Sequence, residues 1–341
     1  MANYFTQNIA IDLGTANTLI YTSKRGVVLD QPSVVALVHN KGNMIPYAFG
    51  KQAKMMVGKT PGDISAIRPL KDGVIADFKA AEEMIKYFIK SVIGSSFFLR
   101  PIAIVCVPYG STPVERRAIH DAVESAGAKE VFLIEEPIAA AIGANLPITE
   151  PVGSMIVDIG GGTTEVGVIS LGSIVVATST RVGGDLMDEC IINYIRQNYN
   201  ILIGEVTAEM IKKSISNIDP ELVNDETIEV GGRDLLRGIP KSFNLNQRDI
   251  ATSLQDPIAS IINTVKKVLE CSPPELSSDV FKYGITVTGG GALLCGIDRK
   301  LETEIGIKVN VAVDPLNSVV LGTGKVLENF DGLKHVLFKQ E

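Results

Sequence analysis

The sequence predicts a layered α/β protein of about two domains, and three observations support this. Its 341 residues exceed the length of one typical domain. A hydrophobic content of 45% supplies enough apolar side chains for packed cores, which excludes intrinsic disorder as the main property of the chain. Strand-like segments such as MIVDIG (155–160) and GITVTGG (284–290) alternate with long amphipathic segments.

Two segments are similar enough to predict a duplicated architecture. IAIDLGTANT (9–18) and MIVDIGGGTTEV (155–166) each contain an apolar strand, an aspartate at its end and a turn rich in glycine and threonine. Chance similarity between two buried strands is disfavoured, because the aspartate, the glycines and the threonines recur together. We therefore expect two similar subdomains that each present a strand-end loop to a common cleft.

Two helices can be placed from their end signals and apolar faces. Thr112 and Glu115 form a predicted capping box and Pro113 occupies the first helical position, so a helix is expected over 113–126. A second helix is expected from Asp256-Pro257 onward. Its buried face is predicted to contain Ile258, Ile261, Ile262, Val265, Val268 and Leu269.

Both repeats have the composition of phosphate-binding loops. Glycine lets backbone N–H groups approach a phosphate closely, and the hydroxyls of Thr15, Thr163 and Thr164 add donors. Asp12 and Asp158 end the two strands, where carboxylates often hold the Mg²⁺ that accompanies phosphates. One isolated aspartate of this kind would be interpreted as a turn cap. The matched pair instead favours a magnesium site.

Two further segments are expected beside these loops. The cluster TGGGAL (288–293) follows an apolar strand and would let a flat purine or ribose approach the backbone. Glu135 and Glu136 end another apolar strand and precede a helix of small residues, where a carboxylate can orient or deprotonate an attacking water. By themselves these acids would be typical of a helix N-terminus. The neighbouring phosphate loops favour the catalytic interpretation.

Charge, cysteine content and the first residues limit the function classes. With 32 basic and 39 acidic residues the net charge is −7, which argues against general binding to nucleic acid. The four cysteines match neither a disulfide framework nor a metal motif, so we expect buried apolar thiols in a reducing compartment. The start shows no secretory signal, and no segment reaches the roughly 18 apolar residues of a membrane span. A cytoplasmic protein is expected.

In combination these features resemble the MreB family of bacterial actin homologues, within the actin, sugar kinase and heat-shock chaperone ATPase superfamily. The resemblance covers nearly the whole chain in matching order. The segments that carry it are IAIDLGTANTLIY, PSVVAL, RPLKDGVIADF, EEMIKYFI, VPYGSTPVERRAI, EEPIAAAIGA, DIGGGTTEVGVISLG, RVGGDLMDE and the glycine cluster at 288–293. It implies an α/β, duplicated RNase H-like (actin-like), two-lobed fold with four subdomains and a central nucleotide cleft.

The resemblance also implies subdomain boundaries and a role for each site residue. The expected subdomains are IA (1–32 with 75–143 and 318–341), IB (33–74), IIA (144–184 with 248–317) and IIB (185–247). Asp12 and Asp158 would organise magnesium, Glu136 would position the attacking water and Thr163 would help to hold it. The residues expected to bind ATP are Thr15, Ala16, Asn17, Gly160, Gly161, Gly162, Ala208, Glu209, Met210, Ile211, Lys212, Gly290, Gly291, Ala292 and Leu293.

One departure from the family pattern bears on base selection. Relatives commonly read AERIKKEIG where this chain has AEMIKKSIS (208–216), so Met210 replaces an arginine near the expected purine. A thioether does not replace the stacking and hydrogen bonding of a guanidinium. ATP is the expected nucleotide, with GTP as the alternative. Glu136 and Thr163 are both present, so hydrolysis is expected to be retained.

The resemblance further implies a membrane loop and a filament. Phe97, Phe98 and Leu99 resemble the membrane-insertion loop of MreB relatives, the alternative being a turn whose aromatic rings pack inward. No basic amphipathic helix precedes Ile9, so binding of one chain would be weak and polymerisation would strengthen it through avidity. Head-to-tail protofilaments, paired antiparallel at the inner face of the cell membrane, are expected. Paralogous chains and membrane morphogenesis proteins are further candidate partners.

These features predict a cytoskeletal ATP hydrolase. Slow hydrolysis, coupled to polymerisation, would regulate membrane-associated filaments that govern cell shape or motility. The alternative is a small-molecule kinase of the same superfamily, which needs a carboxylate base near an acceptor hydroxyl. The EEP pattern at 135–137 favours hydrolysis instead. A chaperone ATPase is disfavoured because 341 residues leave no room for a separate peptide-binding domain.

Overall fold

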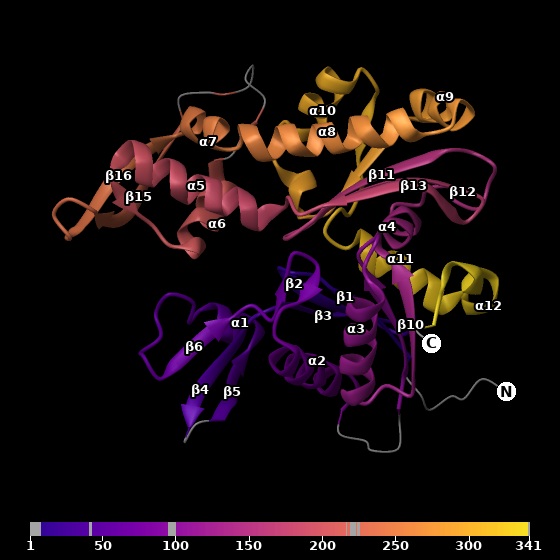
Figure 1. Ribbon diagram of the computed structural model, residues 1–341, viewed down its shortest axis with the longest axis horizontal. Coiled ribbons are helices and arrows are strands. Elements are labelled where there is room, and N and C mark those ends of the chain that lie inside the picture. The colour runs from indigo at the N-terminus through magenta and orange to yellow at the C-terminus, as the bar shows by residue number, and fades with distance from the viewer. Residues whose placement is uncertain are drawn as a thin grey trace.

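A computed structural model describes residues 8–40, 43–94, 100–215, 217–218, 223 and 226–339. The chain forms two lobes, which lie one above the other in Figure 1. Each lobe is built on a mixed five-stranded sheet and is extended by a three-stranded sheet. The predicted duplicated α/β architecture is therefore confirmed.

Lobe I, in the lower half of Figure 1, contains most of the first 143 residues and the C-terminal helices. Its elements are β1 (Ile9–Leu13), β2 (Asn17–Thr22), β3 (Gly26–Pro32), β4 (Val35–Asn40), β5 (Asn43–Phe49), α1 (Gly50–Lys54), β6 (Ile64–Ile67), β7 (Leu70–Lys71), β8 (Val74–Ile75), α2 (Phe78–Ile93), β9 (Ile102–Val107), α3 (Pro113–Ser125), β10 (Glu130–Glu135), α4 (Glu136–Gly143), α11 (Ser318–Glu328), α12 (Phe330–Leu333) and the 3₁₀ turn η2 (Lys334–Val336).

Lobe II contains the chain between α4 and α11. Its elements are β11 (Ser154–Ile159), β12 (Thr164–Ser170), β13 (Ser173–Thr180), α5 (Gly184–Tyr199), β14 (Ile201–Leu202), α6 (Glu205–Ile215), β15 (Thr227–Asp234), β16 (Pro240–Asn246), α7 (Gln247–Ser253), α8 (Gln255–Cys271), α9 (Pro274–Tyr283), β17 (Ile285–Thr288), the 3₁₀ turn η1 (Gly290–Leu293), α10 (Ile297–Ile305) and β18 (Val309–Val311).

The two large sheets have the same topology. Their strand orders are β10-β9-β1-β2-β3 and β18-β17-β11-β12-β13. In each sheet the first three strands run parallel to one another, and each of the last two is antiparallel to the strand before it. The repeat predicted from sequence therefore forms the centre of each sheet. In the strand registers Asp12 lies opposite Leu19, and Asp158 lies opposite Glu165.

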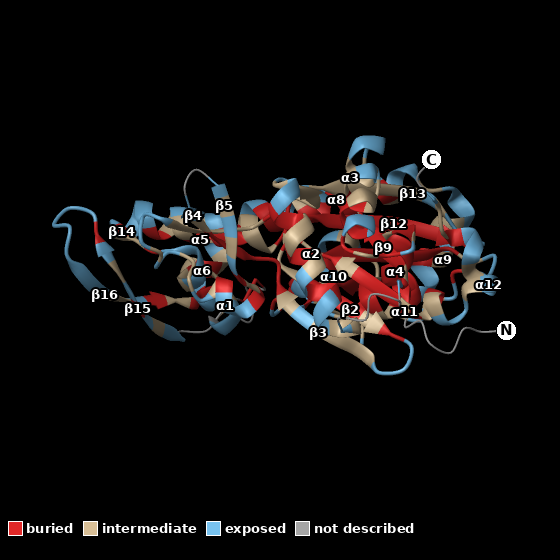
Figure 2. Cartoon of the chain, turned by 90° about the horizontal axis from the view of Figure 1, so that it is seen from below, coloured by how far each residue is buried: buried red, intermediate tan, exposed pale blue. Residues whose placement is uncertain are grey.

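The small sheets lie away from the main core. The order β5-β4-β6 falls within 33–74, and β14-β15-β16 falls within 185–247. Figure 2 shows that buried residues concentrate in the large sheets and their helices, whereas the small sheets are mostly exposed or half-buried. The boundaries of the four subdomains stay a prediction.

Both helices placed from sequence are present. The capping box of Thr112 and Glu115 starts α3. The Thr112 side chain accepts a hydrogen bond from the backbone N–H of Glu115, and the Glu115 side chain accepts one from the backbone N–H of Thr112. Helix α8 begins at Gln255, one residue before the predicted start. Five of its six predicted core residues are buried, and Leu269 is half-buried at the edge of the cluster.

A helix pair joins the two large sheets. Helices α4 and α11 lie between them (Figure 1) and contribute to an apolar cluster that includes Ile134 from β10 and Ile156 from β11. Two glycines set their close approach. A Cβ atom on Gly143 would lie 1.7 Å from the carbonyl oxygen of Ser318, and one on Gly322 would lie 1.8 Å from that of Ala139. The helix backbones therefore touch directly.

Burial of the cysteines differs from the prediction. Cys106 is buried on β9, Cys190 is half-buried, and Cys271 and Cys295 are exposed. The expectation of four buried thiols is therefore wrong for Cys271 and Cys295, which lie at the end of α8 and in the turn after η1. A thiol is too small for its own hydrophobicity to force burial at an element end.

Candidate functional site

The loops that follow β1 and β11 lie against each other where the lobes meet. A Cβ atom on Gly161 would lie 2.7 Å from the Cβ of Ala16, and one on Gly162 would lie 2.7 Å from Oγ1 of Thr15. In the repeat, Thr15 and Ala16 are equivalent to Gly161 and Gly162, so the two contacts are related by the internal symmetry. The structure thus brings the two predicted phosphate loops together, and only glycine permits this approach in the second loop.

The N-terminus of α5 supports the second loop from behind. The N–H of Gly184 donates to the carbonyl of Gly160 at 3.0 Å, and the N–H of Asp185 donates to that of Gly161 at 2.8 Å. Lys212 extends from α6 to the same place, where its Nζ donates to the carbonyl of Gly184 at 2.6 Å. It also pairs with Asp188 at 2.9 Å. Lys212 therefore lies behind the loop, tied to α5.

Two strand-end aspartates face each other across the lobes without a cationic partner. Asp158 is buried and accepts a hydrogen bond from Oγ1 of Thr288 at 2.9 Å. Burial raises its pKa to about 6. Asp12 keeps some accessible surface, but burial of its other sides and the charge of Asp158 raise its pKa to about 7. In the described chain no ion pair links either carboxylate to a lysine or arginine, and carboxylates are the ligands that Mg²⁺ commonly takes in proteins.

The two adjacent acids at the end of β10 have different surroundings. Glu135 turns toward Arg116, with 3.5 Å between its Oε1 and the guanidinium. Glu136 begins α4, and its pKa is raised well above the usual value by burial, then by the charges of Glu165, Asp12 and Asp158. Glu135 therefore forms a structural ion pair, whereas Glu136 is surrounded by other carboxyl groups. Its raised pKa makes the Glu136 carboxylate a stronger base than an exposed glutamate, as a residue that accepts a proton requires.

Thr163 and Glu165 lie on the second repeat, where the charge of Glu165 is close enough to Glu136 to raise its pKa. Thr163 is buried directly before β12, and its methyl group lies 3.4 Å from where a Cβ on Gly73 would be. Glu165, which the sequence analysis did not select, is 1% exposed. Burial raises its pKa to about 8, although hydrogen bonds from Tyr109 and Ser179 act in the opposite direction.

The α6 residues predicted to border the nucleoside divide between two faces of the helix. Ala208 and Ile211 are fully buried in the core of lobe II, so their side chains point away from the lobe junction. Met210 is 44% exposed, and Glu209 is half-buried. Side-chain contact with a nucleoside would therefore come from Glu209 and Met210.

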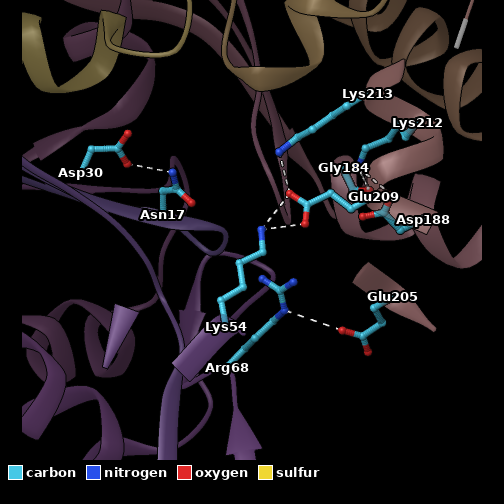
Figure 3. A network of polar contacts seen from close by, with 10 residues as sticks. All are labelled: Asn17, Asp30, Lys54, Arg68, Gly184, Asp188, Glu205, Glu209, Lys212 and Lys213. Carbon is cyan, nitrogen blue, oxygen red and sulfur yellow. Dashed lines mark hydrogen bonds and ion pairs between the residues drawn. The ribbon is translucent and has the colours of Figure 1, made fainter. Parts of the chain in front are cut away.

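Ion pairs cross between the lobes at α6 (Figure 3). Nζ of Lys54, at the end of α1, lies 2.6 and 2.9 Å from the two carboxylate oxygens of Glu209. Lys213 approaches the same carboxylate at 2.7 Å from within α6. Burial alone would raise the pKa of Glu209, but the hydrogen bonds and charges of the two lysines lower it to about 2. Arg68 and Glu205 form a second crossing at 3.9 Å.

The glycine cluster at 289–291 packs against the strand end and the segment after β18. The N–H of Gly289 donates to the carbonyl of Pro315 at 2.9 Å, and a Cβ on Gly291 would lie 2.2 Å from Ile159. Leu316 lies 3.6 Å from a Cβ on Gly290 and is 56% exposed, as is Leu293 at 58%. These leucines form an apolar surface beside the glycines, and Ala292 is buried. Sequence gave no signal for Leu316, which follows β18.

The remaining surface features lie elsewhere or outside the described chain. Two hollows of about 550 and 500 Å³ lie along α8, and neither is lined by a predicted phosphate-loop residue. The predicted membrane loop of Phe97, Phe98 and Leu99 lies outside the described residues. Within the described part of the chain, no helix combines the length and apolar character that a membrane crossing requires.

The family match and the sequence relatives of this chain agree with each other. The family described as MreB/Mbl protein matches residues 6–335. The cell shape-determining protein MreB of Escherichia coli strain K12 is 54% identical over 342 aligned residues, which cover 99% of this chain and 98% of that protein.

Solved structures agree with these sequence relatives. Structures of Spiroplasma citri MreB5 bound to ADP and to AMPPNP each superpose with a TM-score of 0.90 at 39% identity, covering 97% of this chain and 98% of theirs. A MamK double helical filament chain has a TM-score of 0.80 at 19% identity, covering 94% of this chain and 99% of that one. The MamK similarity concerns the fold alone.

Proposed function

Because the chain belongs to the MreB/Mbl family of bacterial actin homologues, we propose that it is a cytoskeletal ATPase whose filaments govern cell shape or motility. The observation that carries this proposal is the contact between the two predicted phosphate loops, with Asp12 and Asp158 near the ends of the strands that lead into them. The ADP and AMPPNP held by the Spiroplasma citri MreB5 structures support an adenine nucleotide. The name of the Escherichia coli relative supports a role in cell shape.

Hydrolysis is assigned to Glu136 and Thr163. Glu136 orients the attacking water and accepts its proton, which its raised pKa favours, and Thr163 holds the water from the opposite lobe. Backbone N–H groups of the two glycine loops surround the phosphates and stabilise their charge. Positioning and electrostatics therefore supply the catalysis, and a slow rate coupled to polymerisation is expected.

Asp12 and Asp158 are assigned to magnesium, which would neutralise phosphate charge. Both carboxyls must lose their protons to hold the cation, and their pKa values are about 7 and about 6. The gain in ATP affinity from magnesium is therefore expected to rise about a hundredfold between pH 5.5 and 8. Fluorescent ATP titrated with and without Mg²⁺ measures this gain. An Asp12→Asn variant whose gain keeps the full pH dependence contradicts the assignment.

Base selection is assigned in part to Met210. Its half-exposed side chain offers a polarisable contact but no hydrogen bond to a purine edge. We expect ATP to be preferred over GTP by less than tenfold, and Met210→Arg to widen that preference. Competition of both nucleotides against a fluorescent analogue checks this. An unchanged ratio in Met210→Arg would place base selection elsewhere.

Filament growth requires different surfaces at the two ends of the molecule. The β15–β16 turn and α9 lie at opposite ends of the long axis (Figure 1), and both expose apolar side chains. These are Leu235, Leu236 and Ile239 at the turn, and Phe281 and Tyr283 at the end of α9. Head-to-tail contact would bury them. Antiparallel pairing of protofilaments and attachment to the inner face of the membrane through Phe97, Phe98 and Leu99 belong to the same proposal.

Sedimentation tests the function as a whole. Purified protein is pelleted with ATP and magnesium, with ADP, and with no nucleotide, while phosphate release is recorded. Nucleotide-dependent pelleting is expected, together with phosphate release that Glu136→Ala lowers at least about a hundredfold. Phosphate release without pelleting under any salt or lipid condition contradicts the proposal. It would favour the kinase alternative, which a panel of sugar acceptors then tests.

A further inference from the structure

Glu165 links the two lobes through its carboxyl group. The side chain extends from β12 of lobe II, where it is almost completely buried. Its Oε2 accepts a hydrogen bond from the backbone N–H of Tyr109, in the loop after β9 of lobe I, at 2.9 Å. Its Oε1 accepts from the hydroxyl of Ser179 on β13 at 3.0 Å. One carboxyl group therefore holds a loop of lobe I against two strands of lobe II.

The loop held by Glu165 lies next to both proposed catalytic residues. Val107, at the end of β9, pairs in register with Glu135, the residue directly before Glu136. Pro108 follows, and it packs beside Gly73, where a Cβ atom would lie 2.8 Å from Pro108 and 3.4 Å from the methyl group of Thr163. Tyr109 comes next. Fixing its N–H therefore fixes a segment that borders the chain on the Glu136 side and on the Thr163 side.

Glu165 also lies close to Glu136 itself. Pro137 follows Glu136, and it packs 3.2 Å from where a Cβ on Gly167 would lie on the same strand as Glu165. Among neighbouring charges, that of Glu165 raises the pKa of Glu136 most. A movement of the Glu165 side chain would therefore reach Glu136 directly.

The internal repeat indicates that the fold itself does not need a carboxyl group here. Asp158 is opposite Glu165, and in the first repeat Asp12 is opposite Leu19. Leu19 is buried in the equivalent place of an equivalent sheet. Burying a carboxyl group is far less favourable than burying leucine. The second repeat carries this unfavourable group at the lobe junction, close to the proposed catalytic residue Glu136.

We propose that Glu165 is a positioning residue for hydrolysis, which holds the loop after β9 so that Glu136 and Thr163 keep their relative places. This rests on the proposed function, because it assumes that Glu136 positions the water. The role depends on the reach of the side chain and its hydrogen bonds. Nucleotide binding itself does not depend on it.

Three substitutions separate the reach of the side chain from its carboxyl group. Glu165→Gln keeps the length and can accept from Tyr109, Glu165→Asp keeps the carboxyl group but is one methylene shorter, and Glu165→Ala removes both. Phosphate release at saturating ATP and magnesium is expected to fall about tenfold in the alanine and aspartate variants, and less than about threefold in the glutamine variant. The dissociation constant of fluorescent ATP is expected to stay within about twofold in all three. Glu130→Gln, which removes the pair with Lys339 at the opposite end of β10, is the matched control with a near-normal rate.

The opposite order of rates, with aspartate active and glutamine inactive, would overturn the proposal in favour of a charge effect. Parallel losses of ATP affinity and phosphate release would indicate a merely structural role and would overturn it as well. If Glu165→Ala does not fold, the glutamine and aspartate variants still show which of the two keeps the higher rate of phosphate release.

The Glu136→Ala variant in the same assay distinguishes failure of the proposed catalytic residue from failure of the positioning role. Undiminished hydrolysis in Glu136→Ala refutes the proposed catalytic role of Glu136, whereas a normal rate in Glu165→Ala with an inactive Glu136→Ala refutes the positioning role alone.

Discussion

Two of the regions where the lobes meet have opposite chemistry. The inner region is the α4–α11 pair, where helix backbones touch at Gly143 and Gly322 and apolar side chains from both large sheets are buried together. The outer region, next to the small sheets, consists of the ion pairs Lys54–Glu209 and Arg68–Glu205. One region has close-packed apolar contacts that require a fixed geometry, and the other has charged contacts between partly exposed side chains.

This difference assigns a different mechanical role to each region. Close-packed backbones tolerate almost no displacement, so the α4–α11 pair behaves as an axis. Ion pairs between partly exposed side chains contribute about 1 kcal/mol or less, so they can break and re-form in solution. The lobes are therefore expected to open at the α6 side and to turn about the α4–α11 side, with the glycine loops between them.

The largest expected effect is at the axis. Gly143→Ala places a Cβ atom 1.7 Å from the carbonyl oxygen of Ser318, which belongs to a helix backbone and cannot move aside. We expect the free energy of unfolding to fall by about 3 kcal/mol or more. Denaturant unfolding followed by circular dichroism measures it. Gly231→Ala is the control, because no atom lies within 4 Å of its added Cβ. A fully stable Gly143→Ala variant would contradict the rigid axis.

The next effect is at the outer crossing. Lys54→Ala removes the pair that joins the lobes, and Lys213→Ala removes a lysine that pairs with the same Glu209 from within α6. A loss of about 1 kcal/mol corresponds to about fivefold faster release of fluorescent ADP. Lys213→Ala is expected to change the release rate by less than about twofold. Stopped-flow release compares them. Equal acceleration in both variants would show that Glu209 acts on the nucleotide rather than across the lobes.

A smaller effect is expected from salt. The pKa of Glu209 is about 2, so the pair with Lys54 stays charged throughout the neutral range and is weakened by screening. Raising the salt concentration from 50 to 500 mM is expected to accelerate ADP release about twofold to threefold in the unmodified protein. In Lys54→Ala the same change should have little effect, and a salt response that persists there would point to other charges.

The smallest effect is expected at the second crossing. Arg68 and Glu205 are 3.9 Å apart, and the carboxylate side chain of Glu205 is 61% exposed. Exposed pairs at this separation contribute little. Arg68→Ala is therefore expected to accelerate ADP release by less than about twofold. A larger effect than that of Lys54→Ala would reverse the order of the two crossings.

Much of the fold was predictable because it depends on local pattern. Short segments of the sequence encode the capping box of α3, the apolar face of α8 and the repeat around Asp12 and Asp158. Each of these features is present in the structure. Cysteine burial was not predictable in this way. Cys271 and Cys295 are exposed because of where their elements end, which composition does not encode.

The candidate site was predictable in part. Glycine loops and strand-end aspartates have a local signature, and the structure brings them together. The separate surroundings of Glu135 and Glu136 have none, because Arg116 on α3 pairs with the first acid only after the helix packs. Glu165 carried one usable signal, since it occupies the place of Leu19 in the repeat, but its Tyr109 contact depends on the other lobe.

The sequence by itself determined the duplicated α/β architecture, the family and the loops that would face a nucleotide, because each rests on residues close together in the chain. Only the tertiary structure decided which side chains join the lobes. Lys54 and Glu209 lie 155 positions apart and Tyr109 and Glu165 lie 56 apart. No local pattern predicts such contacts, because they exist only when the two lobes are folded and packed against each other.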